Sequence, residues 1–213
     1  RKEVNMKLKK KAKTTLIAIV VILVVAVVGI FTYKTFFSKP VIKEAKVLKE
    51  IKNYGYVLKD NKSKKYQALF KDLAKILESD EVDYKAYASK LAEMFVVDFY
   101  SLSDKTAKTD VGGVDIVLPD ILNNFLENAE NTFYKYVESN IYNNRKQKLP
   151  EVNTVEVESV EKTTFTYNDT IDENAYQVKV KWDYTDSDFA NYQKEATLIF
   201  VNKDKKLYLV ELK

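Results

Sequence analysis

Two carboxylates stand where a proton-transfer group could be placed. Asp98 and Asp183 each lie between two large apolar residues. A carboxyl group buried among such residues has a raised pKa and can act as a general acid or base. The alternation of apolar and polar residues instead predicts that both acids lie on the solvent-facing side of their elements. We therefore expect neither to be catalytic.

A second group of acids surrounds a glycine pair. Asp110, Asp115 and Asp120 recur every five residues around Gly112 and Gly113. Carboxylates in a loop can bind calcium, but the spacing D-x-[DN]-x-[DN]-G with its later glutamate is absent. Turn and capping roles explain these acids better. We expect no metal site here.

The composition excludes several kinds of chemistry. The chain has no histidine and no cysteine, so a Ser-His-Asp triad, a thiol nucleophile, a histidine-bearing zinc site and a disulfide are impossible. It has only four glycines and neither of the glycine-rich phosphate-binding patterns. The sequence therefore predicts a protein without cofactor that is not an enzyme.

The most informative segment is apolar. Residues 15–31 read TLIAIVVILVVAVVGIF, without a charge, and a helix of about 17–25 such residues spans a bilayer. We predict a transmembrane helix over residues 14–33. Its lipid-facing side chains include Leu16, Ile19, Leu23, Val27 and Phe31.

Basic residues before this segment predict its orientation. The tail 1–13 contains a cluster that would contact anionic lipid headgroups at the cytoplasmic surface: Lys7, Lys9, Lys10, Lys11 and Lys13. The C-terminal domain is then extracytoplasmic, at the cell membrane. A cleaved signal peptide is the alternative, but the apolar run is longer than usual and no A-x-A site follows it.

In the chain after residue 33, the first predicted elements are helices. Residues 34–58 form a juxtamembrane stalk, helical over Pro40–Asn53, and residues 59–213 form one domain. The 3.6-residue periodicity predicts helices over Lys64–Glu78, with Ser63 as N-cap, over Val82–Phe99 and over Asp120–Tyr142.

The period changes to that of strands after Pro150. We predict a short strand at Val114–Leu118, before the third helix, and four strands after it: Val152–Tyr167 with a bulge near Ser159–Val160, Tyr176–Tyr184, Ala196–Val201 and Leu207–Leu212. The last two form a hairpin through the turn 202–206. Helices followed by strands indicate an α+β fold, with three helices packed on a curved antiparallel sheet of about four strands.

The charge of this domain indicates its partners. Residues 40–213 carry 26 basic and 30 acidic side chains. A nucleic-acid-binding domain needs a basic face, so we expect no direct nucleic acid binding. The chain also has fifteen tyrosines, a residue that serves both cores and protein interfaces.

The order of elements resembles the cone-shaped nuclear transport factor 2-like fold. The ending KEATLIFVNKDKKLYLVELK, residues 194–213, is similar to the last hairpin of that fold. A short cytoplasmic tail, one span and such a domain outside resemble the VirB-eight class of type IV secretion and conjugation scaffolds. The resemblance implies a cone whose candidate lining residues are Phe125, Phe133, Trp182 and Phe200. No functional residue is carried over from that family.

Three functions follow as hypotheses. The first is a non-enzymatic, membrane-anchored scaffold of a bacterial cell-envelope machine, such as a secretion or conjugation system, that forms homo-oligomers and binds other envelope proteins. The second is a membrane-anchored sensor or small-ligand-binding module that uses the cone. The third is a dehydratase- or isomerase-type enzyme, which would need a pKa-shifted acid inside the cone.

Overall fold

The computed structural model describes residues 25–27, 45–167 and 169–213. The chain divides into two units, Arg1–Ile42 and Lys43–Lys213, of which the second is treated below. The predicted basic tail lies outside the described residues, as does all of the predicted span except the helical residues Val25–Val27. Within the described ranges, no helix combines the length and the apolar character that crossing a bilayer requires.

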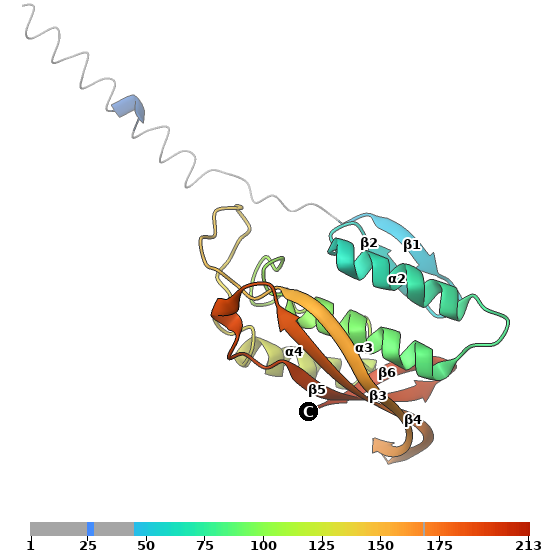
Figure 1. Ribbon diagram of the computed structural model, residues 1–213. Coiled ribbons are helices and arrows are strands. Elements are labelled where there is room, and N and C mark those ends of the chain that lie inside the picture. The colour runs from blue at the N-terminus through green and yellow to red at the C-terminus, as the bar shows by residue number, and fades with distance from the viewer. Residues whose placement is uncertain (1–24, 28–44, 168) are drawn as a thin grey trace, which may run out of the picture. The chain divides into compact units, whose positions relative to one another are not determined.

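The second unit is an α+β domain of three helices packed on a four-stranded antiparallel sheet (Figure 1). The sheet is a meander with the strand order β3-β4-β5-β6. The fold class and the order of helices before this sheet agree with the sequence-based prediction. The elements are α2 (Lys64–Leu77), α3 (Tyr84–Tyr100), the 3-10 turn η1 (Pro119–Ile121), α4 (Leu122–Asn131), β3 (Val152–Tyr167), β4 (Thr170–Tyr184), η2 (Ser187–Phe189), β5 (Glu195–Lys203) and β6 (Lys206–Leu212).

The central element is α3, which lies between α2 and the sheet (Figure 1). Its N-cap is Asp83, whose carboxylate accepts hydrogen bonds from the backbone N–H groups of Lys85 and Ala86. Every residue from Met94 to Tyr100 is buried. Because α2 and the sheet cover opposite sides of α3, its second half has no polar face.

Three details predicted from the sequence are confirmed. Ser63 caps α2 and accepts a hydrogen bond from the N–H of Tyr66. The β3–β4 ladder shifts register between Val157 and Ser159, where the sequence predicts a bulge. The β5–β6 hairpin also forms, and its turn residues Asp204 and Lys205 have positive φ angles of 54° and 69°.

The helix predicted over Pro40–Asn53 is wrong in its described part. The chain there forms a hairpin of β1 (Val47–Ile51) and β2 (Tyr56–Lys59), which turns at Gly55 with φ of 66°. Ile51, Tyr56 and Leu58 are buried in the core of the domain. The helical spacing of apolar residues was coincidental, because burial on one side of β2 stabilises the strand instead.

The helix predicted over Asp120–Tyr142 is too long. It ends at Asn131, and Thr132 has the non-helical angles φ −120° and ψ −96°. The Tyr134 hydroxyl is buried, donates to the carbonyl of Phe99 and accepts from the N–H of Gly112. These long-range bonds draw the chain out of the helix. The predicted strand Val114–Leu118 is reduced to one parallel bridge, Val117 to Leu209.

Candidate functional site

The strongest concentration of buried charge surrounds Asp98. Only 4% of this residue is exposed, so its predicted place on a solvent-facing side is wrong. Its carboxylate accepts hydrogen bonds from Lys62 Nζ at 2.5 Å, Lys105 Nζ at 3.1 Å and the N–H of Gly113 at 2.8 Å. The three donors lie in segments outside α3. The periodicity of the α3 sequence cannot show that these segments cover its polar side.

The same cluster extends through Lys105. Only 5% of this residue is exposed, and its ammonium also lies 3.1 Å from Asp104 Oδ1. Burial lowers the pKa of Lys105, but Asp98 and Asp104 more than offset this and raise it. For Asp98, burial acts in the opposite direction and raises the pKa of the carboxyl. The charges of Lys105 and Lys62 and the Gly113 N–H outweigh burial and hold this pKa below its usual value. The carboxylate is therefore ionised and the ammonium charged.

This arrangement favours structure over proton transfer. A catalytic carboxylic acid needs a pKa near the working pH, whereas that of Asp98 is lowered. Its oxygen atoms are occupied by three donors. The cluster fastens α3 to the segment before α2 and to the loop 101–118.

Gly112 allows the loop to approach α3 closely. A Cβ atom at this position would lie 2.0 Å from the carbonyl oxygen of Asp98 and 2.4 Å from its carbonyl carbon. No side chain fits there unless the backbone moves. The glycine pair thus allows the loop to pack closely around Asp98. In the sequence, two adjacent glycines within an acidic turn are the feature that indicates such a close approach.

The other predicted acids lie on the surface. Asp183 is exposed, as predicted, and its carboxylate forms an ion pair with Lys194. Asp110 accepts from the N–H and hydroxyl of Thr106, which confirms its turn role. Asp120 lies 3.8 Å from Lys203, and Asp115 is exposed. Within 45–167 and 169–213 no three acidic side chains are grouped as a metal site requires.

The four candidate lining residues occupy different environments. Phe200 and Trp182 are buried in the core, and Trp182 packs against Tyr100 with ring centroids 4.3 Å apart and ring planes tilted by 34°. Phe133 is half-buried and packs on Phe99 and Tyr100. Phe125 lines a groove between α4 and β6 with a volume of about 450 Å³, and Trp182 lines a separate one of about 560 Å³ beside Lys194. Neither of these two cavities is lined by more than one of the four candidate residues.

A tyrosine cluster joins the β1–β2 hairpin to the β5–β6 hairpin. The hydroxyls of Tyr56 and Tyr87 lie 2.6 Å apart, and Tyr56 donates to the carbonyl of Leu207 at 2.9 Å. The N–H of Leu207 donates in turn to the Tyr87 hydroxyl at 3.1 Å. Lys206 Nζ stands 4.3 Å from the Tyr56 ring centroid. Tyr87 lies within the helix predicted over Val82–Phe99, whereas Tyr56 lies within residues 34–58, which the sequence predicted to be a stalk outside the domain.

One edge of the sheet is open. β3 is the outermost strand, and beyond Asn153 its outer side makes no backbone hydrogen bond within the described residues. The N–H of Trp182 points toward β5, since it donates to the carbonyl of Lys194. Its partner across the ladder, Val155, therefore directs its own N–H to the open edge, and Val157 does the same two residues on.

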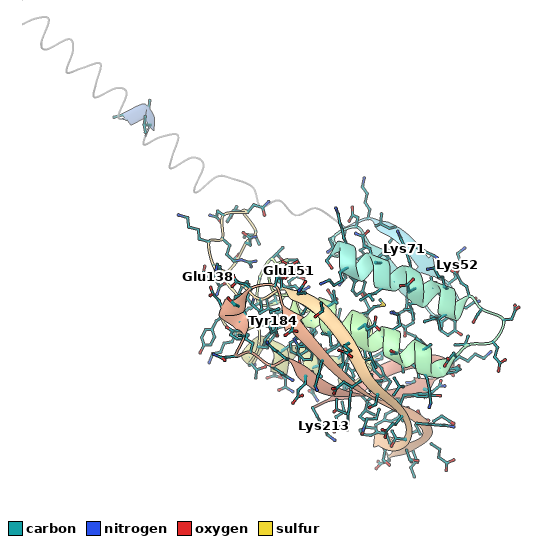
Figure 2. The ribbon with its side chains drawn as sticks, in the orientation of Figure 1. Lys52, Lys71, Glu138, Glu151, Tyr184 and Lys213 are labelled. Atoms are coloured by element: carbon teal, nitrogen blue, oxygen red, sulfur yellow. The ribbon has the colours of Figure 1, made fainter. Side chains whose placement is uncertain are left out.

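An irregular loop, residues 132–149, connects α4 to β3 and stands out from the domain, as Figure 2 shows for Glu138. It exposes Tyr136, Ile141 and Tyr142. No protein-family model, curated protein or solved structure matches the chain.

Proposed function

We propose that this protein is a non-enzymatic, membrane-anchored scaffold of a bacterial cell-envelope machine, such as a type IV secretion or conjugation system. In this proposal the segment 14–33 crosses the cell membrane, the lysine cluster remains cytoplasmic, and Lys43–Lys213 lies outside. The domain then docks copies of itself or other envelope proteins.

The sequence of the N-terminal region supports the anchor. Residues 15–31 carry no charge, and five lysines lie within residues 7–13. A single uncharged run with basic residues on one side is typical of a signal anchor with a cytoplasmic N-terminus. Protease treatment of intact cells tests the orientation, because only an extracytoplasmic domain is degraded.

The element order supports the family expectation. Helices α2, α3 and α4 precede the β3–β6 meander, and residues 116–118 pair with β6, in the order that a nuclear transport factor 2-like cone would have. The β1–β2 hairpin is an addition to that pattern. We infer that the sheet is the curved wall of such a cone.

The open edge of β3 carries the scaffold proposal. Long exposed edge strands template pairing with a further strand, and soluble proteins usually block them with short strands, prolines or bulges. β3 is sixteen residues long and contains no proline. The ladder to β4 shifts register at three places, between Val152 and Thr154, between Val157 and Ser159, and between Thr163 and Phe165, and the regular stretch from Val155 to Val157 lies between the first two. We therefore place the assembly contact at this edge.

Native mass spectrometry of the full chain in mild detergent tests the proposal. We expect a defined homo-oligomer or a discrete set of co-purifying membrane proteins. A bare monomer without partners, at concentrations up to the micromolar range, would overturn it.

Two variants at one position test the edge itself. Val157→Pro removes an outward N–H that β4 does not use, so the domain should fold while the oligomer or complex is lost. Val157→Thr keeps the N–H and the branched side chain shape and is the matched control. Loss of assembly in both variants, or in neither, contradicts pairing at the β3 edge.

The groove beside Phe125 favours a second candidate, a small-ligand-binding module. Phe99, Ile121 and Leu212 supply apolar walls, and Asn124, Asn128 and Glu211 supply polar groups. This combination is usual in small-molecule sites. A small molecule that co-purifies with the chain and is lost in Phe125→Ala would favour this candidate over the scaffold.

A further inference from the structure

The loop 132–149 has a fixed shape although it contains no helix or strand. The Arg145 guanidinium donates to the carbonyls of Lys105 at 2.7 Å, Ser103 at 2.8 Å and Glu138 at 3.1 Å. The side-chain amide of Gln147 accepts from the N–H of Glu138 and donates to the carbonyl of Tyr136. The loop is therefore held to the body of the domain at its base.

This fixed loop presents apolar side chains to solvent. Tyr136 is 76% exposed, Tyr142 47% and Ile141 39%. A loop that is ordered by hydrogen bonds and still exposes large side chains gains nothing from them in the isolated domain. Preorganised exposed aromatic groups are typical of binding surfaces.

The charge around these residues is positive. The loop has four basic residues and one acid, Glu138, whereas the domain as a whole has more acids than bases. Arg145 and Lys148 are engaged, the latter with Asp186 and Asp188 at 2.9 Å. Lys135 and Lys146 are exposed, and Lys135 Nζ lies 5.2 Å from the Tyr136 ring centroid.

The loop lies at the end of the domain where the chain enters. Lys46 exchanges hydrogen bonds with Asp60, and Lys62, two residues on, binds Asp98. Asp98 binds Lys105, whose carbonyl accepts from Arg145 of the loop. This series of direct contacts connects the entry point to the loop. In the view of Figure 1 both lie at the upper edge of the domain.

We propose that the loop 132–149 binds the surface of an anionic bilayer and is a second membrane contact of the chain. The inference rests on the proposed function, in which residues 14–33 anchor the protein. Only residues 34–46 separate that span from the start of the hairpin at Val47, a distance of at most about 45 Å. Tyrosine favours the headgroup level of a bilayer, and lysines near it attract anionic lipids.

The absence of cysteine from the chain permits a site-specific test. Ser139→Cys, labelled with an environment-sensitive fluorophore, reports on the loop without removing an apolar residue. Thr170→Cys, at the opposite end of the β3–β4 ribbon, is the control, since β3 alone is about 50 Å long. The full chain is measured in nanodiscs of neutral lipid and of lipid with anionic headgroups, one chain to a disc.

We expect the label at residue 139 to shift to the blue and to be quenched by spin-labelled lipid in anionic discs only. The label at residue 170 should remain in water. Replacement of Lys135 and Lys146 by Gln should lower the ratio of bound to unbound loop about fivefold for each charge. The matched control replaces Lys162 and Lys205, two exposed lysines elsewhere, and should leave the ratio unchanged.

Three results would overturn the inference or its basis. A label at residue 139 that remains in water in anionic discs contradicts the loop contact while the anchor stands. A label that is shielded only when several chains share a disc indicates a protein contact instead of a lipid contact. A chain that does not enter discs at all contradicts the proposed anchor itself.

Discussion

Asp98 and Lys105 form an ion pair at 3.1 Å in which 4% of one residue and 5% of the other is exposed. A buried pair of this kind contributes little compared with apolar packing, but removal of one partner leaves an uncompensated charge in the interior. Here Asp98 also binds Lys62 and the N–H of Gly113. One carboxylate therefore determines whether several segments remain together.

We predict that Asp98→Asn lowers the free energy of unfolding by about 3 kcal/mol. The amide retains the shape of the side chain and the bond from Gly113, but it leaves the Lys105 ammonium without its main counter-charge. Chemical denaturation of the domain measures the effect. Asp183→Asn, which removes an exposed partner of Lys194, is the matched control and should change stability little. Equal effects of the two substitutions would contradict a structural role of the buried cluster.

The cluster also predicts how stability depends on acid. The pKa of Asp98 is lowered in the folded state, so its contribution is complete above the unfolded value near 4 and is lost as the pH falls below it. Burial instead raises the pKa of Asp104, and this group opposes the loss as the pH falls. Asp98→Asn should therefore flatten the acid limb of the stability profile, and Asp104→Asn should steepen it. Changes in the same direction would refute the assignment.

Gly112 and Gly55 provide a matched pair of glycine substitutions. Gly112→Ala places a Cβ 2.0 Å from the carbonyl oxygen of Asp98, so we expect a loss of about 3 kcal/mol or more. Gly55→Ala meets nothing within 4 Å but must adopt φ of 66°, which costs about 1 kcal/mol. Thermal unfolding compares the two. A Gly112→Ala variant as stable as the Gly55→Ala variant would show that the loop can move away from α3.

The sequence predicted the elements whose periodicity is strong and local. α2, α3 and the β4–β6 strands follow from alternating or helical patterns, and Ser63 follows from capping preference. Two of the errors, in the segments around Tyr56 and Tyr134, lie where long-range bonds override the local pattern. Tyr56 is held in a strand by Tyr87 and Leu207, and Tyr134 is drawn out of α4 by Phe99 and Gly112.

The buried charge cluster was not predictable for the same reason. Asp98 looked like the polar side of an amphipathic helix, and its lysine partners are 36 and 7 residues away along the chain. Periodicity reports which face of a helix is apolar, but it does not report that both faces of α3 are covered. Tyr136 and Ile141 likewise fall within the range predicted as a helix, Asp120–Tyr142, but they lie exposed on an irregular loop.

The tyrosine cluster supplies the last prediction. Tyr87→Phe removes the acceptor of the Leu207 N–H, which then lacks a partner in the interior, and should cost about 2 kcal/mol. Hydrogen exchange at the Leu207 amide should rise, because this bond attaches the β5–β6 hairpin to α3 and, through Tyr56, to β2. Tyr84→Phe is the control: its hydroxyl only reaches the carbonyl of Lys205 at 3.5 Å, so its loss should be nearly neutral. Unchanged protection of Leu207 in the Tyr87→Phe variant would mean that side-chain packing alone holds the two hairpins together.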